Sequence, residues 1–213
     1  MNSEQNSPNT GDPITPEYAI KTQARTFPIF ECRINPDWDV VKFANLSVAR
    51  KHPDGNITVC FYLVDLLCFG VLETEYYYHI PFLEYQDRLN KIRQYMEMKL
   101  VPYVLIHNII CAGIAYGERF GFNPANEFTL VSQFNLEKDT DKIEILEIAC
   151  GDEMGRPIYL KSGFESEEEV LTIIKRLEQT AGDGNFSIVD GFSRDETSEV
   201  EEDDDYDDDQ DVQ

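Results

Sequence analysis

The chain has 213 residues and a formal net charge of −23 at pH 7. It is long enough for one domain with a substantial core, and its negative charge disfavours partners that present phosphate groups. We therefore expect neither nucleic-acid binding nor attachment to an anionic membrane surface.

Three regions are expected along the chain. Residues 1–25 begin with a polar stretch and predict a flexible N-terminal segment, in which Thr15 and Pro16 open a short helix that reaches Arg25. Residues 26–180 hold most of the apolar content and predict a single globular α+β domain. Residues 181–213 predict a disordered acidic tail, because the chain from residue 183 onward carries 14 acidic residues against one arginine.

The five cysteines are odd in number and scattered, and each has apolar neighbours. This pattern is typical of reduced, packed thiols in a cytosolic protein rather than of a disulfide framework. The N-terminus has neither a basic start nor an apolar stretch, so no secretory signal is expected. We therefore expect a cytoplasmic protein.

Four strands are predicted in the first half of the globular domain, from runs of β-branched and aromatic residues or from alternation. The third is apolar almost throughout, so we expect a central strand that is covered on both faces. A turn with Pro53, Asp54 and Gly55 joins the second strand to the third. The four strands span Phe27–Ile34, Asn45–Arg50, Ile57–Val64, and Cys68 or Phe69 to Ile80.

The rest of the chain is expected to be organised around a helix between Pro102 and Phe120. A proline opens this run and Gly121 follows it, as helix start and stop signals require. From Val104 to Tyr116 the run is apolar nearly all the way round, so the helix must be buried on most sides. It falls well short of the roughly 20 apolar residues that a membrane span requires.

Two further helices are predicted around this central one. Pro81 opens an amphipathic helix with apolar residues at helical spacing, and we expect it to pack beside the central helix. A short helix is predicted from Ala125 or Asn126 to Phe134, after the helix-breaking residues that begin at Gly121.

The last part of the globular domain predicts a hairpin and a helix. Ile143–Ala149 alternates and Pro157–Lys161 returns after a glycine turn, which predicts a second hairpin. Ser166 and Glu169 form a capping-box pattern that opens a final amphipathic helix. Because strands and helices do not alternate regularly, we expect an α+β fold, with a mostly antiparallel sheet packed on a buried central helix and flanking amphipathic helices.

Strong catalytic motifs are absent from the sequence. It has no glycine-rich phosphate loop and no paired Cys or His at metal-ligand spacing, so no cofactor or metal is expected. His107 and Cys111 lie one helical turn apart and are a candidate pair of base and nucleophile. We favour packing roles for both, because mid-helix cysteines and buried histidines are usually structural.

A carboxylate cluster offers a second basis for chemistry. Asp65 ends the third strand, and Glu73 and Glu75 follow it closely. With His79 or His107, these side chains could hold a divalent metal ion for a hydrolase or nuclease. We favour a structural role here too, because strand-end carboxylates commonly bind turns or basic side chains.

Two segments resemble an uncharacterised family of bacterial cytosolic proteins: YLVDLLCFG (Tyr62–Gly70) and LIHNIICAGIAYGERFGFNP (Leu105–Pro124). The resemblance covers Ile29–Leu160 and implies a shared fold, but the family has no established activity. Its pattern has a histidine after the GF-x-P turn, where this chain has Ala125 and Asn126. The resemblance therefore carries no catalytic role over to this chain.

The charge distribution and the lack of catalytic motifs predict a non-catalytic cytosolic interaction or regulatory protein. Its acidic tail is expected to engage a basic protein partner, and no membrane partner is expected. A metal-dependent hydrolase or nuclease built on Asp65 is the alternative. A third interpretation treats the acidic body as a nucleic-acid mimic that occupies a basic groove.

Overall fold

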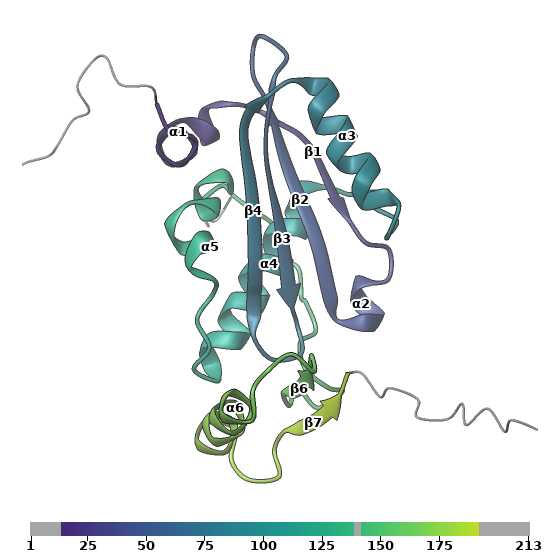
Figure 1. The fold of residues 1–213 in the computed structure, drawn as a ribbon, viewed down its shortest axis with the longest axis vertical. Helices are drawn as coiled ribbons and strands as arrows, with labels where there is room; N and C mark the ends of the chain where they lie inside the picture. The colour runs from purple at the N-terminus through teal and green to yellow at the C-terminus, as the bar shows by residue number, and fades with distance from the viewer. Residues whose placement is uncertain (1–13, 139–141, 192–213) are drawn as a thin grey trace, which may run out of the picture.

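The computed structural model describes residues 14–138 and 142–191. They form an α+β fold in which helices cover both faces of a five-stranded antiparallel sheet, with a smaller α/β unit at one end (Figure 1). In chain order the elements are α1 (Pro16–Gln23), the 3₁₀ turn η1 (Ala24–Thr26), β1 (Ile29–Ile34), α2 (Trp38–Val41), β2 (Phe43–Lys51), β3 (Ile57–Asp65), β4 (Gly70–Ile80), α3 (Phe82–Arg93), β5 (Lys99–Leu100), α4 (Tyr103–Arg119), α5 (Asn126–Leu130), the 3₁₀ turn η2 (Ser132–Asn135), β6 (Ile158–Lys161), α6 (Glu167–Thr180) and β7 (Ser187–Asp190).

The main sheet has the strand order β4-β3-β2-β1-β5, so β4 and the short β5 are its edges. The four predicted strands are confirmed, and β5 adds two residues beside β1. Successive side chains of a strand point to opposite faces, so the pairing of Leu46 with Tyr62 and of Ser47 with Phe61 assigns these pairs to different faces. This register decides which side chains each layer of helices can cover.

Helix α4 covers one face and confirms the predicted central helix. Ile106, Ile109 and Ile110 are fully buried in one core cluster with side chains of β1, β2, β3 and β4. The expected burial on most sides is also confirmed, since only Ala115 and the last two residues of the helix are exposed. In the described ranges, no helix combines the length and the hydropathy that crossing a membrane requires.

Helix α3 covers the opposite face, so the expectation that it packs beside the central helix is wrong. Its Tyr85 and Leu89 are buried against Ala49, Ile57 and Val59. The reason is that β3 is apolar on both faces, and each face needs its own cover to leave the water. Figure 1 shows α3 in front of the sheet and α4 behind it.

The prediction of a second hairpin is also wrong, because residues 143–149 form no strand. The Asn108 side chain of α4 donates to the Glu144 carbonyl oxygen at 2.9 Å and accepts from the Leu146 amide at 2.9 Å. A side-chain amide thus takes the place of a neighbouring strand for this extended segment. The predicted return strand is β6, and it pairs in parallel with β7 instead.

Structured elements extend past both expected domain boundaries. Helix α1 lies within residues 1–25, has Thr15 as its cap, and buries Ala19 and Ile20. A segment that buries such residues is folded, so the expectation of flexibility is wrong for α1. Residues 1–13 lie outside the described residues.

At the other boundary, Phe186 packs in an apolar cluster with Tyr159 and Leu177, and β7 follows it. The fold therefore continues to Gly191, and the boundary expected after Thr180 is wrong. The predicted capping box at the start of α6 is confirmed. The rest of the expected acidic tail, residues 192–213, lies outside the described residues.

Candidate functional site

Asp65 is 2% exposed and serves the turn between β3 and β4. Its Oδ1 accepts hydrogen bonds from the amides of Leu67 at 2.6 Å and Cys68 at 3.2 Å, and its Oδ2 accepts from Phe69 at 3.0 Å. Burial raises the pKa of Asp65 to about 6, although the three amides act to lower it. The carboxylate is thus fully engaged with backbone and points into the turn.

Glu73 and Glu75 do not join Asp65. They lie on β4, where Glu73 pairs in register with Leu63 and Glu75 pairs with Phe61. Both glutamates are exposed, and strand alternation places them on the α3 face of the sheet. They therefore line a surface, while Asp65 is enclosed.

His79 lies near the opposite end of β4 from Asp65. Asp65 pairs with Gly70, nine residues before His79, which corresponds to about 30 Å of strand at about 3.3 Å per residue. The His79 Nε2 atom lies 2.7 Å from Asp54 Oδ2. Within residues 14–138 and 142–191, no group of three or more His, Cys, Asp or Glu side chains could hold a metal ion. The carboxylate cluster that was considered as an alternative basis for chemistry therefore does not converge, and the structural role favoured for Asp65 agrees with its hydrogen bonds to the turn.

His107 and Cys111 do lie together, as their spacing predicted. The Cys111 Sγ atom is 3.7 Å from His107 Nδ1, and the Tyr103 ring centroid is 5.7 Å from that of His107. His107 is only 4% exposed, and neither residue lines any of the hollows described below. A nucleophile and its base must be reachable by substrate, so this arrangement favours the packing roles.

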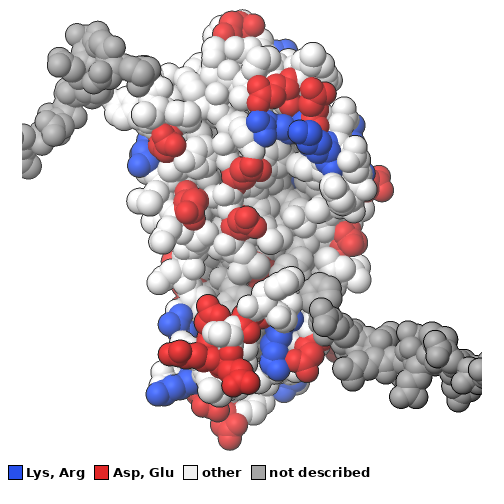
Figure 2. Space-filling view, in the orientation of Figure 1, with Lys and Arg blue, Asp and Glu red and all other residues white. Residues whose placement is uncertain are grey.

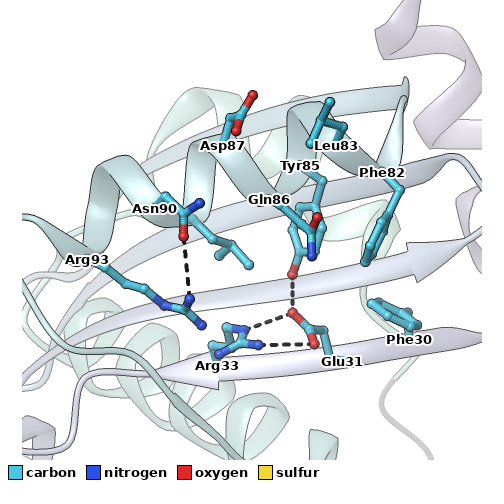
Figure 3. Close-up of a pocket in the computed structure, with 11 residues that line it drawn as sticks. Phe30, Glu31, Arg33, Phe82, Leu83, Tyr85, Gln86, Asp87, Asn90 and Arg93 are labelled. Atoms are coloured by element: carbon cyan, nitrogen blue, oxygen red, sulfur yellow. Dashed lines mark hydrogen bonds and ion pairs between the residues drawn. The ribbon is translucent and has the colours of Figure 1, made fainter.

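A small cavity of about 220 Å³ lies between α3 and β1 (Figure 3). The Glu31 carboxylate accepts hydrogen bonds from Arg33 Nε at 2.8 Å and from the Tyr85 hydroxyl at 2.5 Å. Burial alone would raise the pKa of Glu31, but the hydrogen bonds from Arg33 and Tyr85 outweigh it and hold the pKa below its usual value. Figure 3 shows these three groups facing one another, so the cluster anchors α3 on the sheet.

A larger hollow of about 440 Å³ lies on the part of the same sheet face that α3 leaves open. Its floor is largely apolar, with Phe61 and Leu63 on β3, Ile92 on α3 and Met96 just after α3, and it also includes Asn45 of β2. Glu73 and Glu75 stand along its β4 side. We name this hollow the sheet groove and define it by the residues Phe61, Leu63, Glu73, Glu75, Ile92 and Met96.

The sheet groove continues towards α2. A neighbouring hollow of about 430 Å³ shares Asn45 and Met96 with it and reaches Val41 and Tyr95. Tyr95 is 88% exposed, which is unusual for so large a side chain. Apolar and aromatic surface therefore extends from β4 to α2 along one face of the sheet.

The charged side chains that line these two hollows are all acidic. Glu73 and Glu75 line one hollow, Asp37 and Glu97 line the other, and neither hollow has a Lys or Arg in its lining within the described part of the chain. Figure 2 shows this face with separate acidic side chains on a largely uncharged surface below α3, while acidic side chains crowd over α6. The surface thus combines an apolar floor with a negative rim.

The sequence did not reveal the sheet groove, because β3 was expected to be covered on both faces. That expectation is wrong at Phe61 and Leu63, the two partly exposed residues of β3. The sequence did hold a sign of this open surface. Glu73 and Glu75 are two residues apart on a predicted strand, so both carboxylates lie on the same face of the sheet. Glu73 and Glu75, two of the weighed candidates for a metal site, therefore stand on the rim of an open surface instead.

Comparison with protein-family models, with curated proteins and with solved structures finds no match to this chain. The resemblance of its two segments therefore carries no argument about activity.

Proposed function

We propose that this protein is a non-catalytic interaction protein that binds a basic segment of a partner protein in the sheet groove. One observation carries the proposal: α3 leaves a hollow open on its face of the sheet, with a largely apolar floor and an acidic rim. Contiguous exposed apolar surface bounded by polar side chains is typical of a protein-binding site.

The energetics of the floor support binding. Phe61 and Leu63 keep part of their surface exposed in the folded chain, and each Å² of apolar surface that a partner covers contributes about 25 cal/mol. Tyr95 adds a rigid aromatic side chain of the kind that is enriched among binding hot spots. A partner that covers these three residues gains most of its affinity from them.

The charges support selection of a basic partner. Glu73 and Glu75 favour lysine or arginine at the rim and disfavour acidic side chains. Residues 192–213 carry 12 acidic residues and one arginine, so the same chain also supplies a strong negative field. Such a field raises the rate of encounter with a basic protein more than it raises affinity.

We propose a cytosolic location for this interaction. Cys32, Cys60 and Cys68 are buried free thiols, and burial raises the pKa of Cys32 and Cys60 to about 12. Buried, protonated thiols are typical packing residues of proteins in a reducing compartment. A hydrolase built on Asp65 is not proposed, because its candidate ligands point to separate places.

The proposal is tested by affinity purification with two matched charge-reversal variants. Glu73→Lys/Glu75→Lys reverses the rim, and Glu168→Lys/Glu178→Lys makes the same change in charge on the exposed side of α6. We expect a partner that the wild type and the α6 variant recover and that the rim variant loses. Equal recovery by both variants would overturn the proposed site.

The salt dependence of the recovered complex is a second readout. Exposed charges are screened beyond about 8 Å at physiological ionic strength. We expect the wild-type complex to weaken as salt rises, and the α6 variant to show a similar dependence through the intact rim. A complex that is indifferent to salt would contradict the role of the carboxylates.

A further inference from the structure

We infer that the segment bound in the sheet groove is an amphipathic α-helix with lysine or arginine near both of its ends. The inference rests on the proposed function and adds the conformation and the residue pattern of the partner. In this arrangement the partner helix lies beside α3 and completes the layer on that face of the sheet.

The dimensions of the open surface fit a helix. Strand β3 has nine residues and α3 has 12, which correspond to about 30 Å of strand and about 18 Å of helix. Helix α3 is therefore about 12 Å shorter than the strand, and a helix with its side chains is about 10–12 Å wide. The bare width, from β4 towards α2, spans several strands at about 4.8 Å each and suits a helix of about 12–15 residues.

The position of the groove on the sheet argues against an extended segment. A bound strand gains its affinity from main-chain hydrogen bonds at a sheet edge. The groove lies on a face, where Phe61 and Leu63 offer side chains only. An extended backbone placed there would lose hydrogen bonds to water without replacing them, whereas a helix satisfies its backbone internally. A helix is therefore the conformation that this surface accepts.

The rim sets the pattern of charge on the partner. Glu73 and Glu75 stand on the β4 side, and Asp37 and Glu97 stand at the far end near α2. Because the helix runs from β4 towards α2, acidic groups at both ends of the floor favour basic side chains near both ends of the helix. The stripe itself is expected at i, i+3, i+4 and i+7, the positions that face one side of a helix.

Neither residues 1–13 nor residues 192–213 fit as the bound segment. Residues 1–13 contain no Lys or Arg, and residues 192–213 contain a single arginine among 12 acidic residues. Either end would bring negative charge to a negative rim, which disfavours docking. The occupant is therefore a segment of another protein that carries basic charge.

Three synthetic peptides of about 15 residues test the inference. The first has leucine at the helical positions of one face and lysine near both ends. The second has the same composition in strict alternation, which suits a strand. The third keeps the helical pattern but replaces each lysine with glutamate. Binding is measured by fluorescence anisotropy, and peptide helicity is measured by circular dichroism with and without the protein.

We expect the first peptide to bind at least about tenfold more tightly than either of the others and to gain helicity on binding. We expect Leu63→Lys, with its fold verified by circular dichroism, and Glu73→Lys/Glu75→Lys to weaken this binding by about tenfold or more. Glu168→Lys/Glu178→Lys should leave it unchanged. This set of results supports the helix.

Other results separate the two proposals. Equal binding of the helical and alternating lysine peptides, both lost in the rim variant, would overturn the helix and leave the basic-segment proposal standing. Equal binding of the glutamate peptide would overturn the charge pattern. Binding that neither groove variant weakens would overturn both proposals. A groove filled by a second copy of the chain, seen as a dimer that the Leu63→Lys variant dissociates, would also overturn both.

Discussion

The sharpest structural prediction concerns two glycines of α4 that let the helix touch the turn between β3 and β4. A Cβ atom added at Gly117 would lie 2.5 Å from the Phe69 carbonyl oxygen and 2.8 Å from its carbonyl carbon. A Cβ atom added at Gly113 would lie 2.5 Å from Val64 Cγ1. The first neighbour is backbone held by Asp65, and the second is a side chain. Truncating the neighbouring side chain should therefore relieve the contact at Gly113→Ala, whereas no side-chain truncation can relieve the contact at Gly117→Ala.

The expected magnitudes follow from two opposing effects. Gly→Ala stabilises a helix interior by about 1 kcal/mol, and overpacking a tight contact costs about 1–3 kcal/mol or more. Because the Phe69 backbone cannot rotate away, we expect Gly117→Ala to lose about 2 kcal/mol net. For a chain of this size that corresponds to a fall of about 4–8 °C in the midpoint of thermal unfolding.

The assay is urea denaturation followed by circular dichroism, with a double-mutant cycle. Ala115 is exposed on the same helix, so Ala115→Gly measures the propensity effect alone, about 1 kcal/mol. Val64→Ala should relieve the contact at Gly113, which gives a favourable coupling of about 1–2 kcal/mol with Gly113→Ala. It should give no coupling with Gly117→Ala. A Gly117→Ala variant as stable as the wild type would refute the close approach of helix and turn.

Three further predictions concern the core, the buried carboxylate and the C-terminal boundary. Ile110→Ala should cost about 2–5 kcal/mol in denaturation, because it opens a cavity where the side chain is fully buried. Burial raises the pKa of Asp65 from 3.8 to about 6, so the folded state binds a proton that the unfolded state releases between these values. Relative to Asp65→Asn, the wild type should thus gain stability as pH falls from about 6 to about 4, in urea denaturation at each pH. Truncation after Gly191 should leave the thermal midpoint unchanged, whereas truncation after Thr180 should lower it because Phe186 and β7 leave the apolar cluster.

Local signals in the sequence were sufficient for most elements. The proline and glycine around Tyr103–Arg119 placed the central helix, and Ser166 with Glu169 placed the start of α6. Such signals act through hydrogen bonds and backbone angles within a few residues. They are therefore readable without knowledge of the tertiary structure.

Elements that depend on distant partners could not be predicted in the same way. Residues 143–149 alternate as a strand would, but their backbone bonds to the side chain of Asn108 instead of to a neighbouring strand. Alternation alone does not distinguish these two partners. Strand β7 is four residues long, and its parallel partner β6 precedes it by a whole helix. A short strand with a remote partner leaves no local signal.

The candidate site shows the same limit. Glu73 and Glu75 were noticed as carboxylates near Asp65, but closeness in sequence does not fix the direction of a side chain. The β-strand register places both glutamates on the α3 face, whereas the Asp65 carboxylate accepts hydrogen bonds from the turn between β3 and β4. The groove itself arises because α3 is shorter than the strands it covers, which is a property of two elements together.

Site-specific photocrosslinking tests the central claim most directly. A photoreactive amino acid placed at Leu63, in the groove, is compared with one at Leu171, which is 66% exposed on α6 outside it. We predict covalent adducts from position 63, and none from position 171, with a Lys- or Arg-rich helical segment of a partner protein that mass spectrometry identifies. The same adducts from both positions, or none from position 63, would contradict binding in the sheet groove.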